Sequence, residues 1–99
     1  MDIVERFINY TRFDTQSSEE SDQVPSTAKQ LVFAQYLRDE LQREGFSDVE
    51  MDDKGYIYAT LKSNSTKKLP TIGFISHYDT SPDCSGKDVN AHIVKAYQG

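Results

Sequence analysis

The segment Thr71–Ser76, with the sequence TIGFIS, is a nearly continuous apolar run. Runs of this kind are typical of strands that are buried on both faces of a parallel or mixed sheet. We therefore expect residues 71–76 to form a central buried strand. The chain has 99 residues, which is one domain at most. So short a chain has few elements left to cover both faces of that strand, which suggests that it is part of a larger structure.

The first helix is expected over residues 2–12. Asp2 and Glu5 fit the two positions of a capping box, in which each side chain accepts from the backbone N–H of the other residue. The apolar residues that follow recur at helical spacing. They are Ile3, Val4, Phe7 and Ile8.

The second helix is expected over residues 27–44. Thr27 with Gln30 again matches a capping box, and Gly45 stands where a glycine in the left-handed conformation would end the helix. An apolar stripe indicates the face that packs against the rest of the protein. It consists of Leu31, Ala34, Leu37 and Leu41.

The hydrophobic period then changes from helical to two, which predicts a β-hairpin. Residues 49–51 and 56–61 alternate between apolar and polar, and the sequence Asp52–Gly55 between them is typical of a turn. Polar connections are expected at 14–26 and 62–70. The predicted fold class is α/β: two helices plus a β-hairpin and a central buried strand, in a mixed sheet.

Charge and composition exclude several classes of protein. The formal net charge is −5, whereas a general nucleic-acid binder shows a basic face. No segment approaches the roughly 20 apolar residues of a membrane span, and the first residues do not resemble a signal peptide. Cys84 is the single cysteine, so an internal disulfide cannot form and a cytoplasmic location is expected.

His77 and Asp79 follow the apolar run directly, in the sequence GFISHYDTSPDCSG. In open α/β sheets, ligands bind outside the carboxyl ends of the strands. Residues two apart in an extended chain point the same way, so His77 and Asp79 can face one side. Imidazole is a common zinc ligand, and its second ring nitrogen often donates to a carboxylate. This spacing alone is also common in proteins that bind no metal.

Other reactive side chains nearby predict less. His92 lies in a polar context, which favours a surface residue over a ligand. Ser76 and Ser81 flank the histidine without the G-x-S-x-G turn of many serine hydrolases. For Cys84 the sequence around it indicates no environment that would lower the pKa of its thiol.

A longer stretch, Gly73–Asn90, resembles the first metal-binding segment of the tripeptide aminopeptidases. These belong to the co-catalytic zinc peptidase family, related to carboxypeptidase G and aminoacylase. Residues 5–17 and 23–30 resemble the same enzymes, so the resemblance covers essentially the whole chain. Two departures are small: Asp88 replaces a usual asparagine, and Tyr78 stands where valine is frequent.

This resemblance implies a mixed-sheet catalytic domain with an inserted lid domain and two zinc ions. It implies that His77 is a zinc ligand and that Asp79 is the catalytic-site carboxylate that orients it. The other ligands and the general-base glutamate lie further along in that family. Residues 1–99 would then be the N-terminal part of the catalytic domain, without the remainder or the lid. The full-length protein would be a cytoplasmic zinc metallo-aminopeptidase that releases the N-terminal residue of tripeptides, and this chain alone would be inactive.

Two alternatives stay open at this point. One is a non-catalytic acidic α/β interaction module derived from the start of such a peptidase. The other is self-association, because a truncated sheet leaves an unpaired edge and an apolar face. Neither alternative involves nucleic acid or a membrane.

Overall fold

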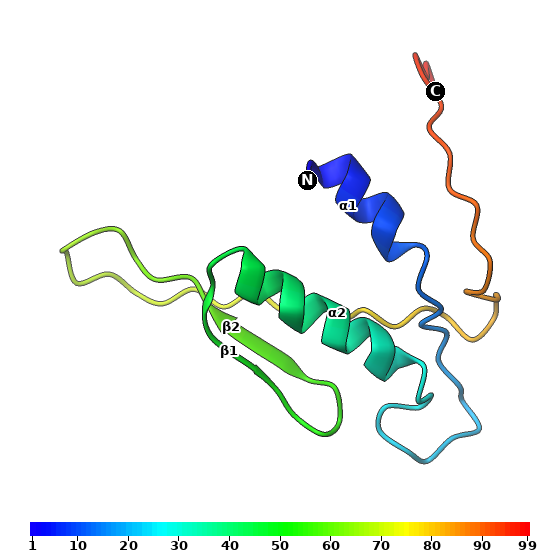
Figure 1. Ribbon diagram of the computed structural model, residues 1–99, viewed down its shortest axis with the longest axis horizontal. Coiled ribbons are helices and arrows are strands. Elements are labelled where there is room, and N and C mark those ends of the chain that lie inside the picture. The colour runs from blue at the N-terminus through cyan, green and yellow to red at the C-terminus, as the bar shows by residue number, and fades with distance from the viewer.

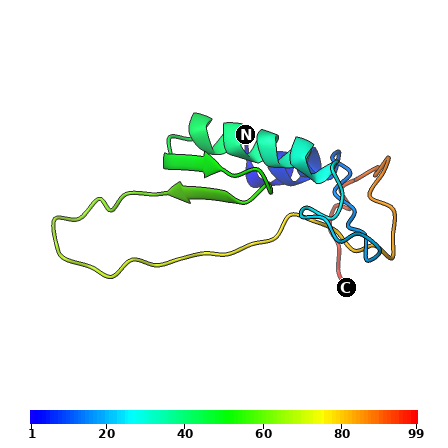
Figure 2. The same ribbon diagram turned by 90° about the horizontal axis from the view of Figure 1, so that it is seen from below.

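The computed structural model describes residues 1–99 and contains two helices and one two-stranded sheet (Figure 1). The elements are α1 (Ile3–Tyr10), α2 (Gln30–Arg43), β1 (Ser47–Met51) and β2 (Ile57–Thr60). Helix α2 covers one face of the β1–β2 hairpin (Figure 2). The predicted pair of helices and the hairpin are therefore confirmed. Neither helix is long and apolar enough to cross a membrane.

The start of α1 and the end of α2 carry the capping motifs that the sequence predicts. In α1, the Asp2 side chain accepts from the Glu5 backbone N–H at 2.8 Å, and the Glu5 side chain accepts from the Asp2 N–H at 3.3 Å. The predicted capping box is thus complete. After α2, Gly45 has a φ of 84° and donates to the Gln42 carbonyl, while Phe46 donates to the Leu41 carbonyl. This pair of bonds is a Schellman motif.

The predicted start of α2 was wrong. The helix begins at Gln30, its N-cap is Lys29, and no side chain caps it. The Thr27 hydroxyl donates instead to the Gln16 carbonyl at 2.8 Å. Because the Thr27 hydroxyl is bonded to the loop at Gln16, it does not cap the helix, and residues 27–29 lie outside α2.

The hairpin forms where the period of two predicted it. Strands β1 and β2 are antiparallel, with Met51 opposite Ile57 and an irregularity between Ser47 and Glu50. Asp52 organises the turn, because its carboxylate accepts from the backbone N–H groups of Lys54 and Tyr56 at 3.0 and 2.9 Å. Such local acceptance is the reason that aspartate favours turns.

An aromatic cluster forms the centre of the small core. Phe33, on α2, is only 5% exposed, and beside it Ala34 is fully buried. Four other rings lie around Phe33 at centroid distances from 4.8 to 6.2 Å. They belong to Tyr10, Phe13, Tyr36 and Tyr78. The cluster thus joins α1, the loop after it, α2 and the segment that carries His77.

A polar contact also joins α1 to α2. The Tyr10 hydroxyl donates to the carboxylate of Glu40, which is buried, and the Arg6 guanidinium lies 3.6 Å from the same carboxylate. Burial first, and then the bond to Glu40, raise the pKa of the Tyr10 hydroxyl well above its ordinary value of 10.0. The hydroxyl therefore stays protonated and keeps donating to Glu40.

The predicted central strand at 71–76 was wrong for this chain. These residues are extended but belong to no strand, and no backbone hydrogen bond joins them to another segment. They run on the side of the hairpin that faces away from α2 (Figure 2). Phe74 and Ile75 are 94% and 102% exposed. An apolar run favours burial, but a strand also needs a neighbour to pair its N–H and C=O groups, and none lies beside it here.

The last part of the chain, 78–99, contains no helix or strand. Its one regular contact is an isolated parallel bridge between Gln16 and Thr80. Its apolar residues Ile93, Val94 and Tyr97 are exposed and belong to neither a helix nor a strand.

Candidate metal centre

His77 and Asp79 contact each other, as their spacing predicts. The Nδ1 atom of His77 lies 2.9 Å from Oδ1 of Asp79 and 3.0 Å from the Asp79 carbonyl oxygen. Both partners are acceptors, so Nδ1 carries the hydrogen and Nε2 of the neutral ring has a free lone pair. The His77 side chain is 85% exposed. When the ring is neutral, the pair therefore presents the lone pair of Nε2 to solvent.

The residues that alternate with this pair hold it in place. Tyr78 points toward the core, where its ring meets Phe33 edge-on at 5.9 Å and its hydroxyl donates to the Gly55 carbonyl at 2.8 Å. Burial, and next the Asp79 carboxylate, raise the pKa of the Tyr78 hydroxyl, so it remains a donor. Thr80 is held on the other side of Asp79. His77 is exposed and Asp79 is partly buried, while Thr80 is exposed but is held through its backbone.

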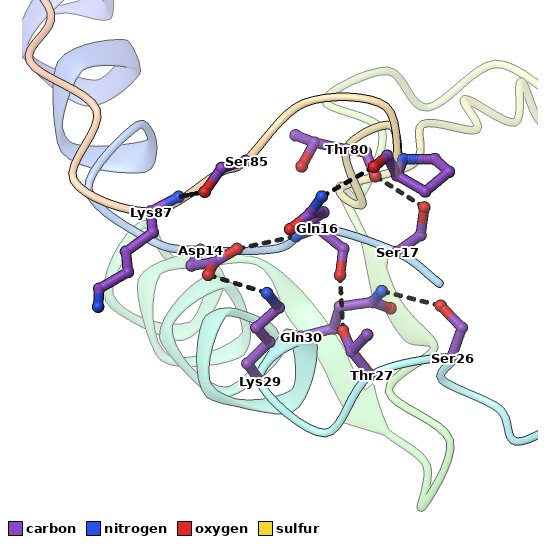
Figure 3. Close-up of polar contacts among 11 residues, drawn as sticks. Asp14, Gln16, Ser17, Ser26, Thr27, Lys29, Gln30, Thr80, Ser85 and Lys87 are labelled. Atoms are coloured by element: carbon purple, nitrogen blue, oxygen red, sulfur yellow. Dashed lines mark hydrogen bonds and ion pairs between the residues drawn. The ribbon is translucent and has the colours of Figure 1, made fainter. Parts of the chain in front are cut away.

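Thr80 is bound to the loop that follows α1 (Figure 3). Its backbone N–H donates to the Thr15 carbonyl at 3.1 Å, and its carbonyl accepts from the Ser17 N–H at 2.9 Å and from the Ser17 hydroxyl at 2.8 Å. The Gln16 side chain donates to the Pro82 carbonyl at 2.9 Å. The segment after the pair is thus tied to residues more than sixty positions earlier.

The same loop is braced from the other side by the start of α2. The Lys29 ammonium lies 2.9 Å from the Asp14 carboxylate, which also accepts from the Gln16 backbone N–H at 3.1 Å (Figure 3). The bond from Lys29, and next the bond from Gln16, hold the pKa of Asp14 below its ordinary value of 3.8. Asp14 is therefore ionised at neutral pH and keeps the loop in position.

Gly86 allows this loop and the segment after Thr80 to approach closely. A Cβ atom at Gly86 would lie 2.9 Å from the Asp14 carboxylate and 3.4 Å from the Thr80 hydroxyl oxygen. A Cβ atom there would have to displace the Asp14 carboxylate, which is bonded to Lys29 and to the Gln16 backbone.

The side chains near His77 can supply one ligand to a metal ion, but they do not form a complete metal site. Nε2 of His77 has the lone pair and the carboxylate partner that zinc-binding histidines have. However, no three side chains among His, Cys, Asp and Glu lie together in a way that could hold a metal ion. A hydrolytic zinc site takes three protein ligands. This chain can therefore supply one ligand, oriented by Asp79, and the others would have to come from elsewhere.

The other reactive side chains form no catalytic pair. The Ser76 hydroxyl is within 3.5 Å of the His77 carbonyl oxygen, and the Ser81 hydroxyl donates to the Asp83 carboxylate at 3.2 Å. Neither contacts a histidine ring nitrogen. Cys84 is a free thiol on the surface, and His92 is exposed on the tail. The arrangement of these residues supports neither a serine nor a cysteine nucleophile.

Sequence reasoning identified the pair but missed what positions it. The sequence predicts only that Tyr78 stands where valine is frequent and that residues 14–26 form a polar connection. The signal in the sequence was the position of Tyr78: successive side chains of an extended segment point to opposite sides, so Tyr78 faces away from His77 and toward the protein. The partners Gly55 and Gln16 are far away in sequence and left no local signal.

No protein-family model matches the chain. Curated proteins named Peptidase T do match: one from Clostridium botulinum strain 657 is 58% identical over 98 residues, one from the Hall strain is 57% identical, and one from Caldanaerobacter subterraneus subsp. tengcongensis is 52% identical over 97 residues. These matches cover 98–99% of the chain but 24% of each relative, so the chain spans about a quarter of their length. The similarity runs through the whole chain and includes the His77–Asp79 segment, and it confirms the resemblance that this segment carries. By sequence, this chain is similar over essentially its whole length to one part of proteins named Peptidase T.

Proposed function

We propose that this chain is the N-terminal part of the catalytic domain of a zinc-dependent aminopeptidase that releases the N-terminal residue from tripeptides in the cytoplasm. In this proposal His77 is a ligand of one of two zinc ions, and Asp79 is the carboxylate that orients it. The remaining ligands, the general base and the lid domain belong to the other three quarters of the relatives' length. The chain alone is then inactive.

The observation that carries this proposal is the bond between His77 and Asp79. It places the hydrogen on Nδ1 and leaves Nε2 exposed as a donor to a metal ion. The similarity to proteins named Peptidase T supports a peptidase. Zinc fits the chemistry of an imidazole ligand with a carboxylate behind it.

The residues of this chain would act by orientation. When bound, zinc supplies Lewis-acid polarisation of the peptide carbonyl. Asp79 holds the hydrogen at Nδ1 of His77 and fixes the plane of the ring. Tyr78 and the bonds at Thr80 keep the backbone of this segment at a set distance from α2 and from the hairpin.

The test replaces the matching 98 residues of the Clostridium botulinum Peptidase T with this chain, at 58% identity. The chimera should hydrolyse tripeptides, release the first residue, and lose activity when zinc is removed by a chelator. His77→Ala should abolish hydrolysis and lower the zinc content. Asp79→Ala should reduce activity or zinc affinity by about 10- to 100-fold, as the loss of a ligand's hydrogen-bond partner does.

His92→Ala is the matched control, because His92 is the other histidine of the chain and is exposed on the tail. It should leave activity and zinc content unchanged. A chimera whose His77→Ala variant keeps full zinc and full activity would refute the site. Calorimetric titration of the 99-residue chain with Zn²⁺ tests the second part of the proposal, since tight stoichiometric binding would contradict an incomplete site.

The exposed segment 71–76 favours a second candidate, an interaction module that associates through this segment. Ile72 is 74% exposed, and Phe74 and Ile75 are more exposed still. Contiguous apolar residues on a surface are typical of association sites. Sedimentation at several concentrations should then show association that Phe74→Ser with Ile75→Ser removes. A monomer at every concentration would rule this candidate out.

A further inference from the structure

We propose that Tyr78 is a positioning residue for the His77–Asp79 pair, through its bond to the turn of the β1–β2 hairpin. The inference rests on the proposed function only where it takes His77 as a ligand, because the effect on the pair itself needs no metal.

The Tyr78 side chain connects the pair to α2 and to the β1–β2 hairpin. Its hydroxyl donates to the Gly55 carbonyl at 2.8 Å, and its ring lies edge-on to Phe33 at 5.9 Å and 86°. Phe33 belongs to α2, and Gly55 closes the turn between β1 and β2. Tyr78 is thus the side chain through which the segment at 77–79 contacts both α2 and the hairpin.

Gly55 is fitted to this contact. A Cβ atom at Gly55 would lie 2.5 Å from the Tyr78 hydroxyl oxygen and 3.1 Å from Cδ2 of Leu31. The backbone of Gly55 also has a φ of 85°, in the left-handed region. The turn and the tyrosine therefore fit together only while residue 55 has no side chain.

The geometry of the pair depends on the backbone that Tyr78 holds. His77 Nδ1 donates toward two oxygens of Asp79, one on the side chain and one on the backbone. Meeting both depends on the backbone conformation of residues 77–79, which contain no turn or bend. Thr80 holds this segment on one side through its bridge to Gln16, and Tyr78 holds it from the middle through its bond to Gly55. Without the bond from Tyr78 to Gly55, the segment that carries the pair is held only by the bridge from Thr80 to Gln16.

The test reads the hydrogen position on His77 by long-range ¹H–¹⁵N NMR of the imidazole, at a fixed pH where the ring is neutral and without metal. The Nδ1–H form should dominate at His77 in the unmodified chain. Tyr78→Phe keeps the ring and removes the bond to Gly55, and it should lower the ratio of Nδ1–H to Nε2–H about 3- to 10-fold, the range expected for one lost hydrogen bond. Tyr56→Phe is the matched control, because Tyr56 is exposed on the same hairpin. It should leave the ratio unchanged.

A second pair of variants separates this contact from backbone strain. Gly55→Ala and Gly45→Ala introduce the same side chain at nearly the same φ, 85° and 84°, but a Cβ at Gly45 meets nothing within 4 Å. Only Gly55→Ala should shift the hydrogen on His77. The helical circular dichroism signal of the chain identifies any variant that has unfolded. An unchanged ratio in a folded Tyr78→Phe chain, or an equal shift in both glycine variants, would overturn the inference.

These results are distinguishable from those that test the proposed function. A shifted ratio with an inactive chimera would keep Tyr78 as a positioning residue and reject the peptidase. An active chimera with an unchanged ratio of Nδ1–H to Nε2–H would support the peptidase and reject Tyr78 as a positioning residue. In an active chimera, Tyr78→Phe should also lower zinc affinity about 3- to 10-fold, while Tyr56→Phe leaves it unchanged.

Discussion

At the scale of single residues, Asp14 shows how a charge in a loop can support a site that it does not touch. It accepts from Lys29 and from the backbone of Gln16, the residue that bridges to Thr80. Folding lowers the pKa of Asp14 below 3.8, because the Lys29 ammonium favours the ionised carboxylate. The folded state therefore binds this proton less readily than the unfolded state does.

The sign of the pH dependence follows from that difference. The contribution of Asp14 to stability is present above pH 3.8 and is lost as the pH falls through the lower pKa of the folded state. Lys29→Met should lower the free energy of unfolding at neutral pH and flatten its fall in this acidic range. Urea denaturation across that range checks the prediction, with Lys62→Met, which forms no ion pair, as the control. Equal acid profiles for the two variants would contradict it.

At the scale of elements, α2 carries the core. Its Phe33 is 5% exposed and contacts aromatic rings from α1, from the loop after it and from the His77 segment. Its neighbour Val32 points outward and is 60% exposed. The helix is thus stabilised by one face, and most of its helical stability depends on that packing.

Phe33→Ala should lower the free energy of unfolding by about 3–5 kcal/mol, since it leaves a cavity at the centre of the cluster. The loss is a large fraction of the total stability of a small domain. Val32→Ala is the matched control and should change stability by less than about 0.5 kcal/mol. Thermal and urea denaturation followed by circular dichroism provide both values. Similar losses in the two variants would mean that the cluster is not the core.

At the scale of the whole molecule, the chain is held together across large sequence separations. The bridge from Thr15 and Ser17 to Thr80 joins the loop after α1 to the segment after His77. The run at 71–76, which lies between the hairpin and this bridge, has no backbone hydrogen bonds of its own. Stability is therefore uneven along the chain, with an unbonded stretch between two anchored ones.

Hydrogen exchange should reveal this division. The amides of Ser17 and Thr80 should be protected, and those of Phe74 and Ile75 should exchange at rates near those of an open chain. The Cβ atom of Gly86→Ala would displace the Asp14 carboxylate that braces the loop, so Ser17 and Thr80 should exchange faster together, by about 5-fold or more. Gly73→Ala, where a Cβ meets nothing within 4 Å, should leave both unchanged. Independent changes at the two amides would contradict a single bridge.

The sequence by itself determined the features that depend on residues a few positions apart. The capping box of α1, the Schellman motif at Gly45, the turn at Asp52 and the approach of His77 to Asp79 all join near neighbours. Each is a local hydrogen bond whose donor and acceptor the backbone brings together without help from the rest of the fold. This is why the candidate pair could be predicted, while its role in binding zinc stays a prediction.

Only the tertiary structure decided which distant partners those features have. Thr27 bonds to Gln16 instead of capping α2, Tyr78 bonds to Gly55, and the apolar run at 71–76 lies unpaired. A sequence pattern records a preference for burial or for hydrogen bonding, but it does not identify the group that satisfies it. That choice depends on which segments the folded chain brings together, because the same hydroxyl or strand edge can be satisfied by several partners.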